Sequence, residues 1–154
     1  MGGPRTVLVL QGPNLNLLGT REPEVYGAGS LSDLTDRLDA VAAAHGVALR
    51  HVQHNGEGAL VGAIHAAAAD GLVGAIVNAA AYTHTSIALR DALLATQLPF
   101  VEVHLSNVWK REPFRHTSLL SDVAIGVISG LGPIGYELGL VALLDHLGAP
   151  PPAS

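Results

Sequence analysis

The sequence predicts an α/β protein whose five-stranded parallel sheet carries helices on both faces. Two observations favour this fold class. Short apolar runs alternate along the chain with segments in which apolar residues recur at helical spacing, as repeated strand–helix units require. The apolar runs are rich in valine, isoleucine and leucine, which is typical of strands that are covered on both sides.

Five segments are predicted to be strands. The first stops before a Gly-Pro turn at 12–13 and is followed by a long loop, 14–29, that is rich in glycine. The third stops at Asn78, and a polar loop over 107–121 separates the fourth from the fifth. The predicted strands are 6–10, 47–53, 72–77, 99–105 and 123–129.

Four segments are predicted to be helices. Ser30 is a suitable N-cap for the first, because Asp33 follows three residues later, and Gly46 ends this helix. The second carries apolar residues over 60–68 and ends at Gly71. The remaining two are expected over 86–97, with Thr83 or Thr85 as the cap, and over 133–147.

This alternation favours a single flavodoxin-like domain over 1–149, a three-layer sandwich with strand order 2-1-3-4-5. The proline-rich tail, 150–154, is expected to be disordered. Ligands of such sheets bind at the carboxyl ends of the strands, near the point where the strand order reverses. Functional residues are therefore expected after the first, third and fourth strands.

Composition excludes several classes of function. The chain has 154 residues and no cysteine, so disulfides, zinc–thiolate sites, iron–sulfur clusters and a cysteine nucleophile are ruled out. The net charge of −5 argues against binding to nucleic acid or an anionic membrane. No apolar stretch resembles a signal peptide or a membrane span, so we expect a cytoplasmic protein. Charged residues make up 14%, against about 25% usually, which suggests a surface partly covered by copies of the same chain.

The loop after the first strand carries a candidate general base. At 14–29 it is much longer than the usual connection of about 2–6 residues, and its glycines would allow it to move as a lid. Arg21 near Tyr26 would favour the phenolate, which could abstract a proton. The alternative is a surface loop with an exposed arginine and a packed tyrosine.

Polar residues also mark the ends of the third and fourth strands. Asn78 ends the third strand, and His84 precedes a helix, where it either faces a ligand or is simply exposed beside a cap. Glu102 and His104 are two residues apart in a strand and therefore share one face of the sheet. A carboxylate there would fix the imidazole tautomer and favour the imidazolium, a good general acid. The alternative is a strand end already in solvent.

The remaining polar patterns are less specific. The segment KREPFRH, 110–116, carries arginines that suit an anionic or polyhydroxy ligand, although a solvated loop explains them as well. The pattern G-x-G-x-x-G at 130–135 follows the last strand, with no later strand to supply an acidic ribose ligand, so we interpret it as a tight turn. His51 and His54 are three apart in a predicted strand and would face opposite sides. No metal site is predicted.

Five segments in this order and spacing resemble the type II 3-dehydroquinate dehydratases: GPNLNLLGTREPEVYG, NAAAYTHTS, VEVHLSNV, KREPFRHTS and ISGLGPIGY. The resemblance extends over about residues 6–147. It departs from the family at Gln11, where asparagine is common, and at Ala79 and Ala80, where proline or glycine is common. It implies a flavodoxin-like fold, trimers assembled into a dodecamer, and cofactor-free dehydration of 3-dehydroquinate to 3-dehydroshikimate in the shikimate pathway.

The resemblance also implies the roles of individual residues. Tyr26 would remove a proton from C2, and Arg21 would hold it as the phenolate. Asn14 would stabilise the enolate through a water. His104, oriented by Glu102, would protonate the departing C1 hydroxyl.

Substrate-binding residues are implied in the same way. The Asn78 side chain and the backbone N–H groups of Leu105 and Ser106 would hold the carboxylate. His84 and Arg115 would bind the ring hydroxyls, and Asp91 would reach a neighbouring subunit's site.

Four other functions compete with this interpretation. A receiver domain needs an acidic cluster after the first strand and a flavin site needs a phosphate loop there, yet Pro13 and Asn14 occupy that position. A Schiff-base dehydratase would need a buried lysine, and Lys110 lies in a charged loop. An inactive homologue acting as an oligomeric scaffold should have lost the tyrosine, arginine or histidine, and all three are present.

Overall fold

A computed structural model describes residues 5–20 and 29–149. Its five parallel strands lie in the order β2-β1-β3-β4-β5, which confirms the predicted topology. The strands are β1 (Thr6–Gln11), β2 (Ala48–Gln53), β3 (Gly74–Asn78), β4 (Phe100–His104) and β5 (Gly126–Ser129). The α-helices are α2 (Leu31–Ala44), α3 (Glu57–Ala69), α4 (Ile87–Thr96) and α5 (Ile134–His146).

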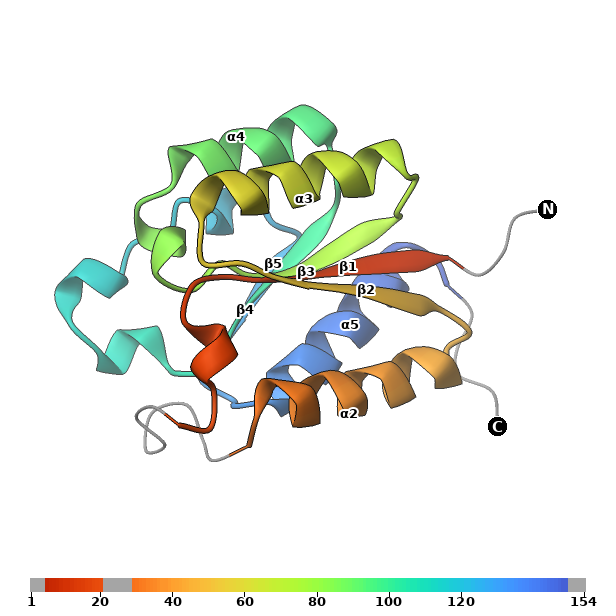
Figure 1. Cartoon of the computed structure of the whole chain (residues 1–154), viewed down its shortest axis with the longest axis horizontal. Helices are drawn as coiled ribbons and strands as arrows, with labels where there is room; N and C mark the ends of the chain where they lie inside the picture. Colours follow the sequence, from red (N-terminus) through yellow and green to blue (C-terminus); the bar gives the residue numbers. More distant parts are fainter. Residues whose placement is uncertain (1–4, 21–28, 150–154) are drawn as a thin grey trace.

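The helices form a layer on each face of the sheet (Figure 1). Helices α3 and α4 cover one face, and α2 and α5 cover the other. Alternate residues of the strands therefore enter two separate cores. Val7 and Val9 of β1 pack in the core beneath α2 and α5, whereas Leu8 and Leu10 pack in the core beneath α3 and α4. This two-sided burial is the reason that the strands carry so few polar residues.

Short 3₁₀ helices connect the larger elements, and all but the last of them lie at the carboxyl edge of the sheet, whereas the last leads into the start of β5. One follows β1, one follows β3, and three lie between β4 and β5: η1 (Leu15–Leu17), η2 (Ala80–His84), η3 (Val108–Lys110), η4 (Pro113–Arg115) and η5 (Ser121–Val123). The irregular connections are thus concentrated at the edge where the candidate residues are expected.

Helix caps agree with the prediction at α2 and differ at α4. Ser30 and Asp33 form a complete capping box, because each side chain accepts the other's backbone N–H. The cap of α4 is Ser86, whose hydroxyl accepts the N–H of Leu89, and not Thr83 or Thr85 as predicted. The reason is that Thr83 lies within η2, so the chain turns into α4 only at Ser86.

The fifth strand is shorter than predicted. It begins at Gly126 and not at residue 123, because residues 121–123 form η5. Both Val123 and Ala124 donate their N–H groups to the carbonyl of Leu120, and Asp122 forms an ion pair with Arg90 of α4. These local bonds outweigh the β-propensity of the apolar residues.

The glycine pattern after β5 is a tight turn, as interpreted from the sequence. Gly130 and Gly132 both have positive φ angles, +91° and +71°, which L-residues with a Cβ rarely adopt. Gly135 lies in the next helix, α5, and a Cβ there would come within 3.3 Å of Ile128. A Cβ at Gly139, one turn later, would come within 3.0 Å of Val103. The two helical glycines therefore let α5 lie close against β4 and β5.

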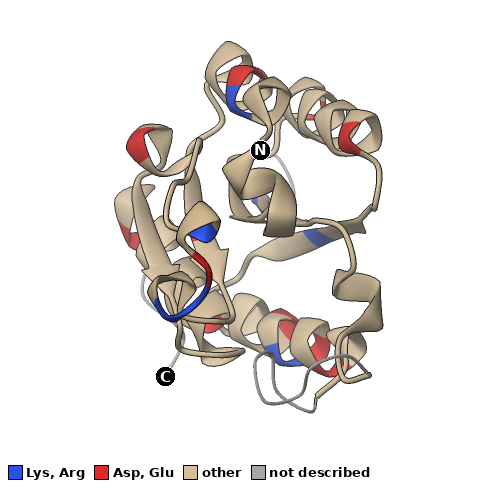
Figure 2. Ribbon diagram, turned by 90° about the vertical axis from the view of Figure 1, so that its left-hand side faces the viewer, with Lys and Arg blue, Asp and Glu red and all other residues tan. Residues whose placement is uncertain are grey.

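Charged residues are spread over helices, strands and loops and form no single basic face in Figure 2. Within residues 5–20 and 29–149, no helix combines the length and apolarity needed to span a membrane. The same residues contain no group of three metal-binding side chains. His51 pairs with Asp39 at 2.7 Å, and His54 lies beyond the end of β2 and not within the strand as predicted. The tail 150–154 lies outside the described residues.

Candidate active site

A cavity of about 150 Å³ lies at the carboxyl ends of β1, β3 and β4. This is the edge at which the doubly wound topology places ligands. Seven of the eleven residues predicted for the site line it: Asn14, Asn78, His84, His104, Leu105, Ser106 and Arg115. The lining is completed by Pro13, Leu15, Ala80, Ala81, Val108 and Arg111.

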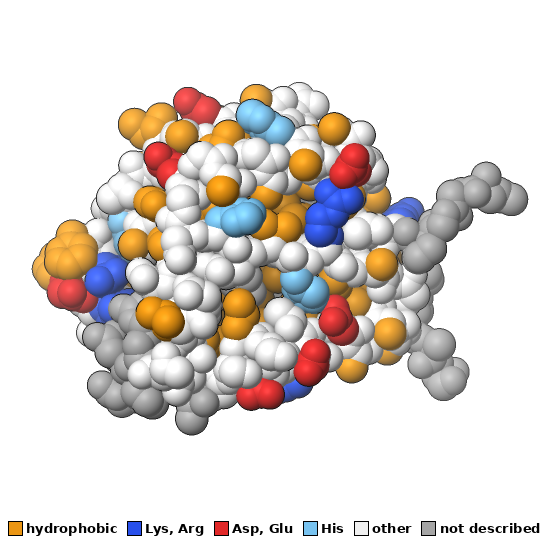
Figure 3. All heavy atoms as spheres, viewed as in Figure 1, with side chains coloured by type: hydrophobic (Ala, Val, Ile, Leu, Met, Phe, Trp, Pro, Cys, Tyr) orange, Lys and Arg blue, Asp and Glu red, His pale blue; other side chains and the backbone are white. Residues whose placement is uncertain are grey.

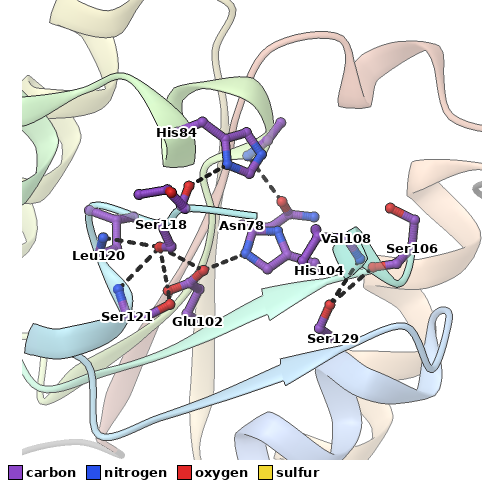
Figure 4. Close-up of polar contacts among 12 residues, drawn as sticks. Asn78, His84, Glu102, His104, Ser106, Val108, Ser118, Leu120, Ser121 and Ser129 are labelled. Carbon is purple, nitrogen blue, oxygen red and sulfur yellow. Dashed lines mark hydrogen bonds and ion pairs between the residues drawn. The ribbon is translucent and has the colours of Figure 1, made fainter. Parts of the chain in front are cut away.

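The central feature of the cavity is a buried carboxylate–imidazole pair. Glu102 and His104 project from the same side of β4, as their spacing predicted, and Nε2 of His104 lies 2.5 Å from Oε2 of Glu102. Glu102 is 1% exposed and His104 is 6% exposed. Because Glu102 engages Nε2, the other ring nitrogen, Nδ1, is the one available to the cavity (Figure 4). This is a suitable arrangement for a proton donor.

Glu102 is held by two serines that the sequence did not single out. The hydroxyl of Ser118 lies 3.0 and 3.1 Å from the two carboxylate oxygens, and that of Ser121 lies 2.7 Å from Oε1 (Figure 4). Burial raises the pKa of the Glu102 carboxyl. The hydrogen bonds from His104, Ser121 and Ser118 outweigh this effect and hold the pKa below its ordinary value. Glu102 is therefore ionised at neutral pH.

His84 faces the same cavity and is held as a neutral ring. Its Nδ1 lies 2.8 Å from the carbonyl oxygen of Thr117, which can only accept, so Nδ1 carries the proton. Burial lowers the pKa of His84, and the nearby His104 and Arg115 lower it further. The two imidazoles stack with their centroids 6.5 Å apart. The Nε2 atom of His84 is therefore a hydrogen-bond acceptor for a ligand hydroxyl.

The turn after β1 is shaped by a glycine and an asparagine. Gly12 contacts the chain that follows β3 so closely that a Cβ would lie 2.3 Å from the carbonyl oxygen of Ala79. Asn14 adopts a left-handed conformation with φ of 70°, which asparagine tolerates better than most residues. Its backbone N–H donates to Oδ1 of Asn55, a residue that the sequence did not indicate. This turn brings Asn14 to the cavity.

The arginines come from the predicted segment between β4 and β5. Arg115 lines the cavity, and its Nε donates to Glu112 at 2.9 Å. Arg111 lines the cavity as well, although the resemblance pointed only to Arg115. Lys110, the chain's single lysine, is exposed and is not among the residues that line the cavity.

Asp91 is not among the residues that line the cavity. It lies on the exposed side of α4, and its neighbour Arg90 forms an ion pair with Asp122. Arg21 and Tyr26 lie outside the described residues.

The doubly wound sheet and the carboxylate–imidazole pair at its carboxyl edge together define a flavodoxin-like α/β protein with a site equipped for proton transfer. Residues 5–144 match the family model described as dehydroquinase class II. The chain therefore belongs to the class II dehydroquinase family, which confirms the resemblance seen in the sequence.

Individual relatives support this membership. The chain is 60% identical over 144 residues to a 3-dehydroquinate dehydratase of Ralstonia pickettii, covering 94% of this chain and 93% of the relative. It is 57% identical over 145 residues to 3-dehydroquinate dehydratase 1 of Pseudomonas aeruginosa, covering 94% and 99%. The crystal structure of a type II dehydroquinase from Propionibacterium acnes superposes with a TM-score of 0.87 at 41% identity, covering 94% of this chain and 99% of the other.

Proposed function

We propose that this protein is a 3-dehydroquinate dehydratase, which converts 3-dehydroquinate to 3-dehydroshikimate in the shikimate pathway. The observation that carries the proposal is the buried Glu102–His104 pair opening on a cavity in a chain of the class II dehydroquinase family. The curated relatives cited above carry this activity in their names.

His104 is the proposed general acid. The reaction removes a proton from C2, beside the ketone, and the resulting enolate expels the C1 hydroxyl. That hydroxyl leaves as water only if a proton reaches it, and Nδ1 of the imidazolium faces the cavity to supply one. Glu102 supports this role because its ionised carboxylate stabilises the charged ring. The elimination transfers protons only, so this scheme uses no cofactor.

Tyr26 is the proposed base that receives the C2 proton, and Arg21 stabilises its phenolate. Both assignments rest on the sequence resemblance, since these residues lie outside the described part of the chain. Asn14 is proposed to stabilise the enolate through a water. Its position on the cavity wall, with the backbone N–H tied to Asn55, supports this role.

The substrate is proposed to bind by its carboxylate and its ring hydroxyls. The Asn78 amide and the backbone N–H groups of Leu105 and Ser106 hold the carboxylate, because all three residues lie at the ends of β3 and β4 on the cavity wall. His84 accepts a hydrogen bond from one ring hydroxyl, and Arg115 binds another. The neutral state of His84 supports the first assignment.

The working unit is proposed to be a dodecamer, a tetramer of trimers, in which Asp91 reaches a neighbour's site. Large apolar side chains on the surface support an assembly: Ile87 and Leu94 of α4 are 64% and 49% exposed. In Figure 3, apolar side chains are distributed among few charged ones on the face shown. The cytoplasmic location expected from the sequence belongs to this proposal as well.

Ultraviolet absorbance of the conjugated enone product tests the proposed activity. The purified protein, treated with a chelator, is incubated with 3-dehydroquinate, and we expect the absorbance to rise without added metal or cofactor. His104→Ala should lower kcat by about 10²–10⁴-fold, the usual contribution of general acid catalysis. The matched control is His51→Ala, since His51 pairs with Asp39 away from the cavity. No enone from the wild-type protein would refute the activity, and loss on chelation with recovery on adding one metal would refute the cofactor-free mechanism.

A further inference from the structure

Three buried side chains form a hydrogen-bonded chain that ends at the cavity. Gln11 and Asn78 are the last residues of β1 and β3 and are paired in the parallel register. Tyr136, in the first turn of α5, bridges them: its phenol oxygen lies 2.7 Å from Nδ2 of Asn78 and 2.7 Å from Oε1 of Gln11. All three are buried. Of the three, only Asn78 lines the cavity.

The direction of every bond in this chain follows from one backbone group. The N–H of Ala80 can only donate, and it lies 3.1 Å from the side-chain oxygen of Asn78 (Figure 4). The amide nitrogen of Asn78 must therefore face Tyr136 and donate to its oxygen. The phenol proton is then directed to Oε1 of Gln11. Burial raises the pKa of the Tyr136 phenol, so the phenol keeps this proton at neutral pH.

The close packing of α5 places the phenol at this point. Gly135 and Gly139 flank Tyr136 on the side of the helix that faces the sheet, where Cβ atoms would meet Ile128 and Val103. A side chain at either position would hold the helix farther from β4 and β5 than it now lies. Tyr136 therefore meets the two amides at a separation set by the backbone and not by a flexible side chain.

We propose that Tyr136, with Gln11 as its acceptor, is a positioning residue that holds the Asn78 amide in the orientation needed to bind the substrate carboxylate. The inference rests on the proposed function, in which Asn78 binds that group. An amide nitrogen carries two hydrogens, so one remains for an anionic ligand beyond the bond to Tyr136. Without the phenol oxygen, the Asn78 side chain loses its anchor on the nitrogen side and can turn away from the carboxylate.

The side-chain amide of Gln11 contains a buried atom whose hydrogen-bonding capacity is not satisfied within the part of the chain that the structure describes. Its Nε2 is buried and has no hydrogen-bond partner among the described residues. A buried amide nitrogen without a partner is destabilising, so glutamine is a poor choice here for stability alone. Its oxygen, by contrast, is needed as the acceptor for Tyr136, which agrees with a role in orienting the chain of bonds.

The test separates KM from kcat. Because Asn78 contacts only the carboxylate in this scheme, Tyr136→Phe should raise KM for 3-dehydroquinate by about tenfold or more and leave kcat within about twofold. Gln11→Met, which keeps the length and removes the acceptor, should raise KM in the same direction by a smaller factor. In an Asn78→Ala background, Tyr136→Phe should have no further effect on KM. An unchanged KM in Tyr136→Phe, or an equal effect of this substitution in the Asn78→Ala background, would overturn the proposal.

A control and a second measurement guard against simple misfolding. Leu143→Ala removes a buried side chain from the same helix, about two turns from Tyr136, and should lower Tm while leaving KM unchanged. An NMR spectrum of the side-chain amides should show one Asn78 proton protected from exchange in the wild-type protein and exposed in Tyr136→Phe, and Gln11→Met, which keeps the phenol oxygen, should reduce the protection by a smaller factor. This measurement needs no catalysis, so it tests the positioning role even if the proposed activity fails. Equal protection in the wild type and both variants would refute that role.

Discussion

Replacing Ser118 with alanine should raise the pKa of the Glu102 carboxyl. The Ser118 oxygen accepts the backbone N–H groups of Leu120 and Ser121, so its own proton must go to Glu102. The substitution removes that donor and leaves the bonds from His104 and from the Ser121 hydroxyl in place. The carboxylate then loses part of the stabilisation that opposes its burial.

The size of the effect follows from the kind of bond that is lost. A hydrogen bond to a charged group contributes about 1.5–3 kcal/mol. The Ser118 hydroxyl divides its proton between the two carboxylate oxygens of Glu102, so we expect its contribution at the lower end of this range. About 1.4 kcal/mol corresponds to one pH unit, so the titration of Glu102 should move upward by about one pH unit. A carboxyl group whose pKa is lower in the folded than in the unfolded protein stabilises the fold at pH values above its unfolded pKa. This stabilisation is lost as the pH falls through the folded pKa. In Ser118→Ala the stabilisation should be smaller, and its loss should be complete at a higher pH.

Carbon-13 NMR of labelled glutamate carboxyl groups measures this titration directly, and Glu102→Gln assigns the signal. Ser129→Ala is the matched control, because the Ser129 hydroxyl bonds to the carbonyl of Ser106 and not to Glu102. Its Glu102 titration should coincide with that of the wild-type protein. A midpoint that does not move in Ser118→Ala, or that moves equally in Ser129→Ala, would refute the reasoning.

Four further predictions concern the base, the mechanism, the assembly and the backbone. Tyr26→Phe should lower kcat by about 10²–10⁴-fold in steady-state assays, and near-normal turnover would show that the base lies elsewhere. Borohydride added with substrate should not inactivate the enzyme, since Lys110 is exposed and does not line the cavity; a mass adduct on Lys110 would contradict this. Asp91→Ala should lower kcat/KM without changing Tm, and sedimentation should give a multiple of three subunits; a fully active monomer would exclude a shared site. Ala80→Gly should raise the free energy of unfolding by about 0.5–1 kcal/mol in urea denaturation, because Ala80 has a φ of 52°, where glycine is favoured. A lower stability would show that this conformation is not strained.

The fold was predictable because the three central strands, β1, β3 and β4, are buried on both sides. That burial gives apolar runs that stand out from the helical segments, and the alternation of the two leaves few possible topologies. The predicted element boundaries that were wrong are those that local hydrogen bonds determine. Val123 is apolar and β-branched, but the turn around Leu120 and the pair between Asp122 and Arg90 keep it out of β5.

The central pair of the site was predictable for a similar reason, and its support was not. Glu102 and His104 are two residues apart in a strand, so their contact follows from the period of the backbone. Ser118 and Ser121 reach Glu102 from 16 and 19 residues away through an irregular loop, where no periodicity indicates direction. Tyr136 is 58 residues from Asn78, and a tyrosine in the first turn of a helix gives no sign of its distant partner.

The contact at Gly12 has a consequence for how the sequence can vary. The N–H of Gly12 donates to the carbonyl of Asn78 at 2.8 Å, and the space for a side chain at position 12 is already filled by the backbone of Ala79. Neither partner in this clash is a flexible group that could turn aside. The residues after β1 and those after β3 are thus joined into one unit at the carboxyl edge of the sheet, although 66 positions separate Gly12 from Asn78. A random library at position 12 should therefore yield functional clones almost solely with glycine, and insertions or deletions beside either residue should be tolerated only when both segments are exchanged together.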